Sequence, residues 1–215
     1  MNGRSIRSTL AHMRVTAEDV HRIATGYHPD PARSMSLRAE AYVEPRWSSF
    51  EDAAVFARTW QWICHVEQLT EPGSYVASTV AGMPIVVVRD RSGVLLAFYN
   101  VCKHRAHELL SGSGVTRNIV CPYHAWTYDL SGGLKAARRA DRMETFDKST
   151  VCLDQVQVEE FGGFVYVNLD PNAEKLAVQA PDLAEEIDFW APDVAALTHA
   201  KRLTYTIDSL SLIHI

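Results

Sequence analysis

The chain has 215 residues, of which 47% are hydrophobic and 22% charged, and its formal net charge is −5. This composition is ordinary for a globular protein with one large domain, or one domain and part of another. The acidic balance argues against nucleic acid or an anionic membrane as partner, and no apolar run has the length of a membrane span or signal peptide. We therefore expect a cytoplasmic protein that binds neither nucleic acid nor membrane.

The N-terminal part of the chain predicts helices joined by a loop. Thr16 precedes two acidic residues and is a candidate N-cap for a short helix. Residues 26–34 are rich in Gly and Pro and indicate a loop. The segment 48–60 carries apolar residues at helical spacing, and Ser48 or Ser49 is the expected cap of this second helix.

From about residue 62 the pattern changes to short β-branched and aromatic runs separated by Gly- and Pro-containing turns. These candidate strands lie at 73–80, 83–90, 94–101, 118–130 and 151–170, the last forming two strands around a Gly-Gly pair. Their number and spacing predict a mainly β fold, an antiparallel sandwich or barrel. A short helix is expected at 181–190, and 200–208 resembles the first strand of a further domain.

Two Cys-His units, Cys102-x-His104 and Cys121-x-x-His124, each stand where a candidate strand runs into a loop. Two loops of this kind can project side by side from one end of a β domain and hold a metal between them. In a reducing cytosol, paired cysteine and histidine residues favour a metal site over a disulfide. Cys102, His104, Cys121 and His124 are therefore the candidate metal ligands.

The order of these ligands distinguishes between two kinds of centre. A tetrahedral zinc site also accepts two cysteines and two histidines, but zinc fingers usually place like ligands together in sequence. The mixed order Cys-His-Cys-His suits a Rieske [2Fe–2S] centre, in which two cysteines hold one iron and two histidines hold the other. A zinc-binding module remains the alternative at this point.

The tracts C-K-H-R-A and C-P-Y-H-A-W resemble the cluster-binding signature of the Rieske non-haem iron oxygenases, the ring-hydroxylating oxygenase α-subunits. Arg105, Tyr123 and Trp126 occupy the flanking positions usual in that family. In the respiratory Rieske proteins, the places of His107 and Tyr123 hold cysteines that form a disulfide. The absence of this brace makes the chain similar to the lower-potential oxygenase and ferredoxin group.

The neighbouring aromatic and histidine residues carry smaller expectations. The hydroxyl of Tyr123 is expected at a cluster sulfur or a ligand cysteine, where it would raise the reduction potential, or else the ring packs in the loop. Trp126 is expected to pack in the loop as well. His107 is expected at the surface or at a neighbouring carbonyl.

The resemblance implies an oxidoreductase that depends on O₂ and, through a reductase or ferredoxin, on NAD(P)H. It implies a [2Fe–2S] cluster in this chain and, in the full-length parent only, a mononuclear Fe(II) held by two histidines and a carboxylate. It also implies a homotrimer and a small-molecule substrate. The matching tracts are most similar to oxygenases of quaternary ammonium compounds, of the carnitine, choline and betaine type.

The expected organisation has four parts: a lead-in (1–61), a Rieske domain (62–170), a linker with the start of a truncated α+β catalytic domain (171–208), and a non-native tail (209–215). The tail resembles the translation of a transposon end used in sequencing libraries. The family's iron-binding tract is missing, so we expect no catalytic residue here and no hydroxylation by the chain alone. A stand-alone Rieske ferredoxin is the alternative.

The remaining cysteines and histidines have less specific expectations. Cys64 and Cys152 stand in apolar, strand-like runs and are expected to be buried as small hydrophobic side chains. His199 is expected at the surface. Neither His199 nor His214 has the spacing of an iron ligand, and we assign neither to a metal.

Overall fold

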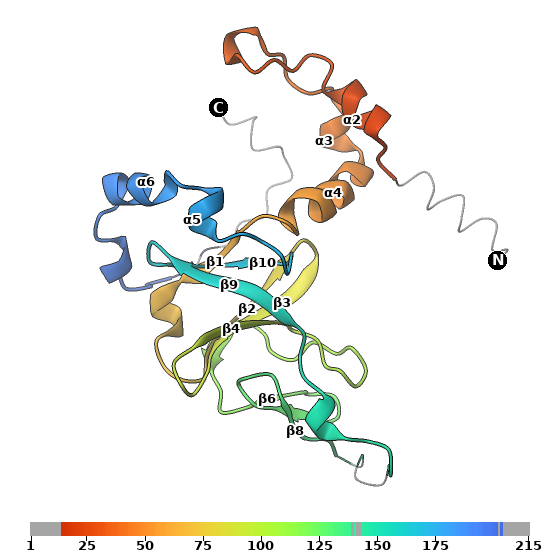
Figure 1. The fold of residues 1–215 in the computed structure, drawn as a ribbon, viewed down its shortest axis with the longest axis vertical. Coiled ribbons are helices and arrows are strands. Elements are labelled where there is room, and N and C mark those ends of the chain that lie inside the picture. Colours follow the sequence, from red (N-terminus) through yellow and green to blue (C-terminus); the bar gives the residue numbers. More distant parts are fainter. Residues whose placement is uncertain (1–13, 139, 141–142, 202, 204–215) are drawn as a thin grey trace, which may run out of the picture. The chain divides into compact units, whose positions relative to one another are not determined.

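The protein is described by a computed structural model that covers residues 14–138, 140, 143–201 and 203 (Figure 1). The described residues fall into two compact units, an N-terminal unit (14–55, with 203) and a β unit (56–201). Over the described ranges, no helix combines the length and apolar character needed to cross a membrane. The strand expected at 200–208, the tail at 209–215 and His214 lie mostly or wholly outside these ranges.

The N-terminal unit consists of short helices, and its first cap agrees with the sequence. The Asp19 N–H donates to Thr16 Oγ1 at 3.2 Å, and the Thr16 N–H donates to Asp19 Oδ2 at 2.9 Å, which forms a capping box. The helices are α2 (Ala17–Ile23), η1 (Pro31–Arg33), α3 (Glu40–Val43) and α4 (Pro45–Glu51), and a π-helical turn follows, η2 (Asp52–Phe56).

The expected start of the second helix at Ser48 or Ser49 is wrong. Helix α4 begins at Pro45 and has Glu44 as its N-cap, without a side-chain hydrogen bond at that cap. Proline suits the first helical position because its fixed φ matches the helix and its missing N–H would have no partner there. This preference places the start of the helix three residues before the serines.

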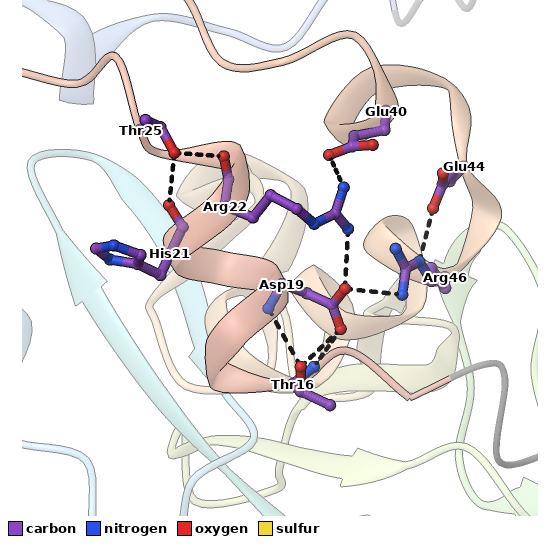
Figure 2. A network of polar contacts seen from close by, with 8 residues as sticks. All are labelled: Thr16, Asp19, His21, Arg22, Thr25, Glu40, Glu44 and Arg46. Atoms are coloured by element: carbon purple, nitrogen blue, oxygen red, sulfur yellow. Dashed lines mark hydrogen bonds and ion pairs between the residues drawn. The ribbon is translucent and has the colours of Figure 1, made fainter.

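A network of ion pairs joins α2 to α3 and α4 (Figure 2). Asp19 pairs with Arg22 at 2.9 Å and with Arg46 at 3.3 Å, while Arg22 also pairs with Glu40 and Arg46 with Glu44. The hydrogen bond from the Thr16 N–H, together with the Arg22 contact, lowers the pKa of Asp19 far below its usual value. Each charged group in this network therefore has a partner within the unit.

The β unit contains two antiparallel sheets, and β6 and β8 lie at its end away from β1 and β10 (Figure 1). The large sheet has the strand order β1-β10-β9-β4-β3-β2-β5 and the small one β6-β7-β8. The strands are β1 (Gln61–His65), β2 (Ser74–Val80), β3 (Met83–Arg89), β4 (Leu95–Tyr99), β5 (Ser113–Val115), β6 (Ile119–Val120), β7 (Thr127–Tyr128), β8 (Leu134–Ala136), β9 (Gln155–Phe161) and β10 (Phe164–Asn168). The expected antiparallel β fold is confirmed.

Strand β3 shows how the sheet organises the core. Its side chains are buried on both faces, and alternate residues enter two different hydrophobic clusters. Ile85 and Val87 belong to one cluster, whereas Val86 and Val88 belong to the other, which we call the site-side core because it also contains Cys102. The two ligand loops are thus built onto one of the two cores.

Side chains of β1 and of the residue before it contact the segment that follows the sheet. The His65 ring Nε2 lies 2.8 Å from the Val194 carbonyl oxygen, and the Trp60 indole N–H donates to the Glu174 carbonyl at 2.9 Å. This segment contains α5 (Leu176–Gln179), α6 (Leu183–Trp190) and η6 (Val194–Ala196). The helix expected at 181–190 is confirmed. Two further turns within the unit are η3 (Val66–Leu69) and η5 (Lys148–Thr150).

Candidate metal centre

The two Cys-His units form the same backbone turn. In the first, the Cys102 N–H donates to the His107 carbonyl at 2.9 Å; in the second, the Cys121 N–H donates to the Trp126 carbonyl at 2.8 Å. A further hydrogen bond closes each turn one residue earlier, from the N–H of Ala106 or Ala125 back to the carbonyl of the cysteine. Both units are therefore six-residue loops with a cysteine at the first position.

Each loop contains an alanine in the left-handed region, Ala106 at φ +52° and Ala125 at φ +56°. Residues with a side chain rarely adopt this conformation, which costs roughly 1–2 kcal/mol relative to the right-handed one. Such backbone strain is concentrated at functional sites, where the surrounding structure maintains it. The two alanines turn the chain sharply enough to bring both ends of each loop together.

The two candidate cysteines are buried in the site-side core, each with 2% of its surface exposed. The Tyr128 hydroxyl lies 3.3 Å from the Cys102 sulfur and accepts a hydrogen bond from the Lys103 N–H at 3.0 Å. Its proton can therefore be donated to the sulfur when Cys102 is a thiolate. Burial, followed by the contact with Cys102, raises the pKa of Tyr128, so this hydroxyl keeps its proton.

The two candidate histidines lie toward the surface, with their ring centroids 4.7 Å apart at an angle of 72°. His104 is exposed and His124 is partly buried. The Nδ1 atom of His124 is buried and has no hydrogen-bond partner among the described residues. Burial and the positive charges of neighbouring groups lower the pKa of His124, which favours the neutral imidazole that binds metals.

These features test whether the residues suit a metal group. A buried ring nitrogen without a partner is costly unless something binds it, and a neutral imidazole nitrogen is the commonest metal ligand among side chains. No three His, Cys, Asp or Glu side chains in the described parts of the chain gather as ligands of a single ion would. A paired arrangement, with two buried thiols inside and two imidazoles outside, fits a two-iron Rieske cluster.

An open cleft of about 810 Å³ lies over the two imidazoles. Lys103, Arg105 and Arg138 line it, and the described residues of the lining include no carboxylate. The Lys103 ammonium is paired with Asp154, whereas Arg105 and Arg138 make no ion pair with another described residue. The outer face of the centre is therefore cationic in a chain whose net charge is −5.

The structure agrees with the second expectation for Tyr123, packing in the loop, and with the expectations for Trp126 and His107. The hydroxyl that meets a candidate cysteine belongs to Tyr128, whereas Tyr123 is 55% exposed and packs on His124 with ring centroids 3.7 Å apart. Trp126 packs in the loop, as predicted, and is 8% exposed. His107 is exposed, and its Nδ1 lies 2.6 Å from the Glu108 carbonyl oxygen, also as predicted.

The expectations for the other cysteines and for His199 are partly confirmed. Cys64 is buried, as predicted, but Cys152 is exposed, so the expectation of a buried thiol there is wrong. Cys152 pairs with Gly133 only through an isolated β-bridge just before β9, and its side chain leaves the core at this point. His199 is exposed, as predicted, and its N–H donates to Glu67 at 3.2 Å.

Comparison with known proteins gives a consistent result. The family described as the Rieske [2Fe–2S] domain matches residues 59–147, a range that contains all four candidate ligands. The chain is 39% identical over 170 residues to the carnitine monooxygenase oxygenase subunit of Acinetobacter pittii, which covers 79% of this chain and 46% of that protein. It is 32% identical over 200 residues to the chloroplastic choline monooxygenase of Beta vulgaris, which covers 92% of this chain and 44% of that protein.

Solved structures show the same likeness. The quaternary ammonium Rieske monooxygenase CntA in complex with L-carnitine is 41% identical with a TM-score of 0.72, and the match covers 76% of this chain and 47% of that one. A naphthalene 1,2-dioxygenase mutant is 29% identical with a TM-score of 0.67, over 72% of this chain and 36% of that one. The chain thus spans about half the length of the curated relatives first compared with it.

Proposed function

Because the chain belongs to the Rieske non-haem iron oxygenases, we propose that it is the electron-accepting part of an oxygenase α-subunit. Cys102, His104, Cys121 and His124 are the proposed ligands of its [2Fe–2S] cluster. The observation that carries this assignment is the buried Nδ1 atom of His124, which lacks a partner among the described residues and stands beside His104. A neutral imidazole nitrogen in this state has a lone pair available for a metal.

The donor set and its surroundings suit this role. When bound, a cluster with two thiolate and two imidazole ligands supplies a one-electron carrier of higher potential than an all-cysteine centre. Cys102 and Cys121 keep their sulfurs in the apolar site-side core, away from bulk water. Tyr128 holds a hydroxyl proton at the Cys102 sulfur, and such a hydrogen bond raises the reduction potential.

For the whole protein we propose O₂-dependent hydroxylation of a small quaternary ammonium compound, with electrons from an NAD(P)H-dependent reductase. The named activities of the carnitine and choline monooxygenases support this substrate class. The mononuclear iron would be held by residues outside this chain, in a cytoplasmic homotrimer. Within the chain, we propose 62–170 as the cluster domain, preceded by the lead-in 1–61 and followed by the linker 171–208.

The two alternative functions have less support. A stand-alone ferredoxin does not account for the similarity to oxygenase subunits, which extends over 79% of this chain in the first relative. A zinc module does not account for the mixed Cys-His-Cys-His order, because zinc fingers usually place like ligands together in sequence. The oxygenase assignment therefore explains both the comparisons and the paired geometry of the donors.

Anaerobic purification of the full chain, with iron and sulfide analysis and an EPR spectrum after dithionite reduction, tests the proposal. We expect a red-brown protein with two irons and two sulfides per chain, and the low average g value of a mixed-ligand cluster. Colourless protein that contains zinc would contradict the ligand assignment and restore the zinc module. If the chain contains the cluster but the full-length parent does not bind carnitine or choline, only the proposed substrate class is contradicted.

A further inference from the structure

The two ligand loops contact each other through their last residues. Because both loops are six-residue turns, His107 and Trp126 occupy corresponding sixth positions. Trp126 of the second loop stacks on His104 of the first, with ring centroids 4.8 Å apart and an angle of only 10°. His107 of the first loop lies 5.7 Å from Tyr123 of the second. Of these two sixth residues, Trp126 is the one that stacks on a candidate ligand of the other loop.

The indole of Trp126 is held firmly from several sides. It is 8% exposed and belongs to the site-side core together with Cys102 and Cys121. The Phe146 ring packs against it with centroids 5.6 Å apart at 54°, and its own carbonyl accepts the Cys121 N–H at 2.8 Å. Trp126 is therefore tied to the core, to a neighbouring aromatic ring and to the backbone of a candidate ligand.

The imidazole of His104, in contrast, is exposed and makes no hydrogen bond within the described part of the chain. Its ring contacts there are the parallel stack on Trp126 and the edge contact with His124. Metal-binding histidines are usually oriented by a hydrogen bond to their second ring nitrogen. In this chain, the Trp126 indole contacts the face of the His104 ring and can orient its plane in a different way.

We propose that Trp126 is the positioning residue of His104: its fixed indole sets the plane of the exposed imidazole and couples the first loop to the second. The proposal rests on the assignment of His104 as a cluster ligand. The same geometry predicts an asymmetry between the two imidazoles. Tyr123, which packs on His124, is 55% exposed and has no comparable anchoring, so its contribution should be much smaller.

Substitutions in the full, cluster-loaded chain test this proposal. Trp126→Leu keeps an apolar side chain but removes the stack, and Trp126→Phe retains a smaller ring that can stack. Tyr123→Leu removes the exposed contact, and Phe98→Leu is the matched control, because Phe98 is fully buried in the same core and has no recorded ring contact with His104. The readouts are the histidine nitrogen couplings in pulsed EPR, the midpoint potential, and the rate of iron loss to a chelator.

We expect Trp126→Leu to broaden or shift one of the two histidine nitrogen couplings, to change the potential, and to speed iron loss about three- to tenfold. Trp126→Phe should restore most of the couplings, whereas Tyr123→Leu and Phe98→Leu should leave them near those of the unsubstituted chain. Unchanged couplings and potential in a folded Trp126→Leu chain would overturn the proposal. The same changes in Phe98→Leu would also overturn it, since they would reflect general loosening of the core.

If Trp126→Leu fails to fold, an NMR measurement on the iron-free, unsubstituted chain still tests the proposal. The ring current of the indole should shift the His104 ring protons upfield in the NMR spectrum of the unsubstituted apoprotein. Shifts like those of an exposed histidine would overturn the proposal without any variant. If the unsubstituted chain takes up no [2Fe–2S] cluster at all, the proposed function itself fails. This outcome differs from a cluster-loaded chain whose histidine couplings do not change when Trp126 is substituted, which contradicts only the role of Trp126.

Discussion

The N-terminal unit and the β unit each contain a cluster of polar side chains, and the two clusters differ in how their groups are satisfied. In the N-terminal unit, Asp19 and the charged residues around it are paired with each other at the surface (Figure 2). In the candidate metal centre, the Cys102 sulfur and the His124 Nδ1 atom are buried, and Nδ1 lacks any partner in the described residues. A closed network is sufficient for structure, while an open one requires a ligand.

An unpaired buried atom is not by itself evidence for a metal. The Trp47 indole nitrogen of the N-terminal unit is also buried without a partner among the described residues. An indole N–H can only donate a hydrogen bond, so it cannot bind a cation. The Nδ1 atom of His124 differs because a neutral imidazole offers a lone pair, and because His104 contacts this ring and each of the two loops also carries a buried thiol. The chemistry of the donor set decides between the two cases.

The largest effect is expected when one donor of the open network is removed. Cys121→Ser should abolish cluster binding, because a serine oxygen at this buried position is a poor ligand for the soft iron–sulfur group. Cys152→Ser is the matched control, since Cys152 is exposed and lies outside the centre. Iron and sulfide analysis of the purified chains measures the effect. Equal iron–sulfur content in both variants would contradict the view that the candidate metal centre, unlike the network around Asp19, requires a bound ligand.

A smaller effect, on the midpoint potential of the cluster, is expected from the hydroxyl that contacts one of the donors. Tyr128→Phe removes the hydroxyl 3.3 Å from the Cys102 sulfur and should lower the midpoint potential by on the order of 40 mV, the equivalent of about 1 kcal/mol for one hydrogen bond. The reason is that this bond is strongest when the sulfur carries more negative charge, in the reduced state. Redox titration measures the shift. Tyr123→Phe is the control, and an equal shift there would show that Tyr128 has no special role.

A substitution that relieves backbone strain in a ligand loop should raise the stability of the β unit. Ala125→Gly replaces a residue at φ +56° with the one residue that adopts this conformation without strain, so the β unit should become about 0.5–1 kcal/mol more stable. Ala97→Gly, in the buried strand β4, should destabilise the unit by about 1 kcal/mol. Denaturant unfolding compares the two. A loss of stability in both variants would mean that the strain at Ala125 is absent.

The strands and the candidate ligands were predictable because both leave local patterns in the sequence. Alternation and turn residues locate β2, β3 and β4 to within a residue or two. The order and spacing of the Cys-His units indicate the cofactor without any knowledge of the fold. Strand 118–130 is interrupted, because the six-residue loop separates β6 from β7. Local hydrophobicity alone does not distinguish this loop from the strands around it.

Contacts made across the chain could not be predicted in the same way. Tyr128 reaches Cys102 from a residue 26 positions away, and only the pairing of the two loops brings them together. Cys152 stands in an apolar run, yet its exposure depends on where β9 begins. The parallel stack of Trp126 on His104 likewise depends on the fold. The sequence therefore supplied the candidate donors, and the structure was needed to find the residues that contact them.

The smallest effect is expected in the closed network. Since its partners lower the pKa of Asp19 below the ordinary value of 3.8, this carboxylate stabilises the N-terminal unit above that pH. The contribution is lost as the pH falls below about 4 toward the lowered pKa. The protection factors of the α2 amides, which are exchange rates corrected for the intrinsic pH dependence, should therefore fall on acidification, and Asp19→Asn should reduce them about two- to fivefold at neutral pH.

Glu18→Gln is the matched control for this last prediction. Glu18 shares the first turn of α2 but, within the described residues, makes no recorded ion pair, so its loss tests the helix dipole alone. The cluster's EPR signal should be unchanged in Asp19→Asn, because a network whose charges are already paired has no role in binding iron. A weakened EPR signal in that variant would show that the two polar clusters are coupled, and the contrast between closed and open networks would no longer hold.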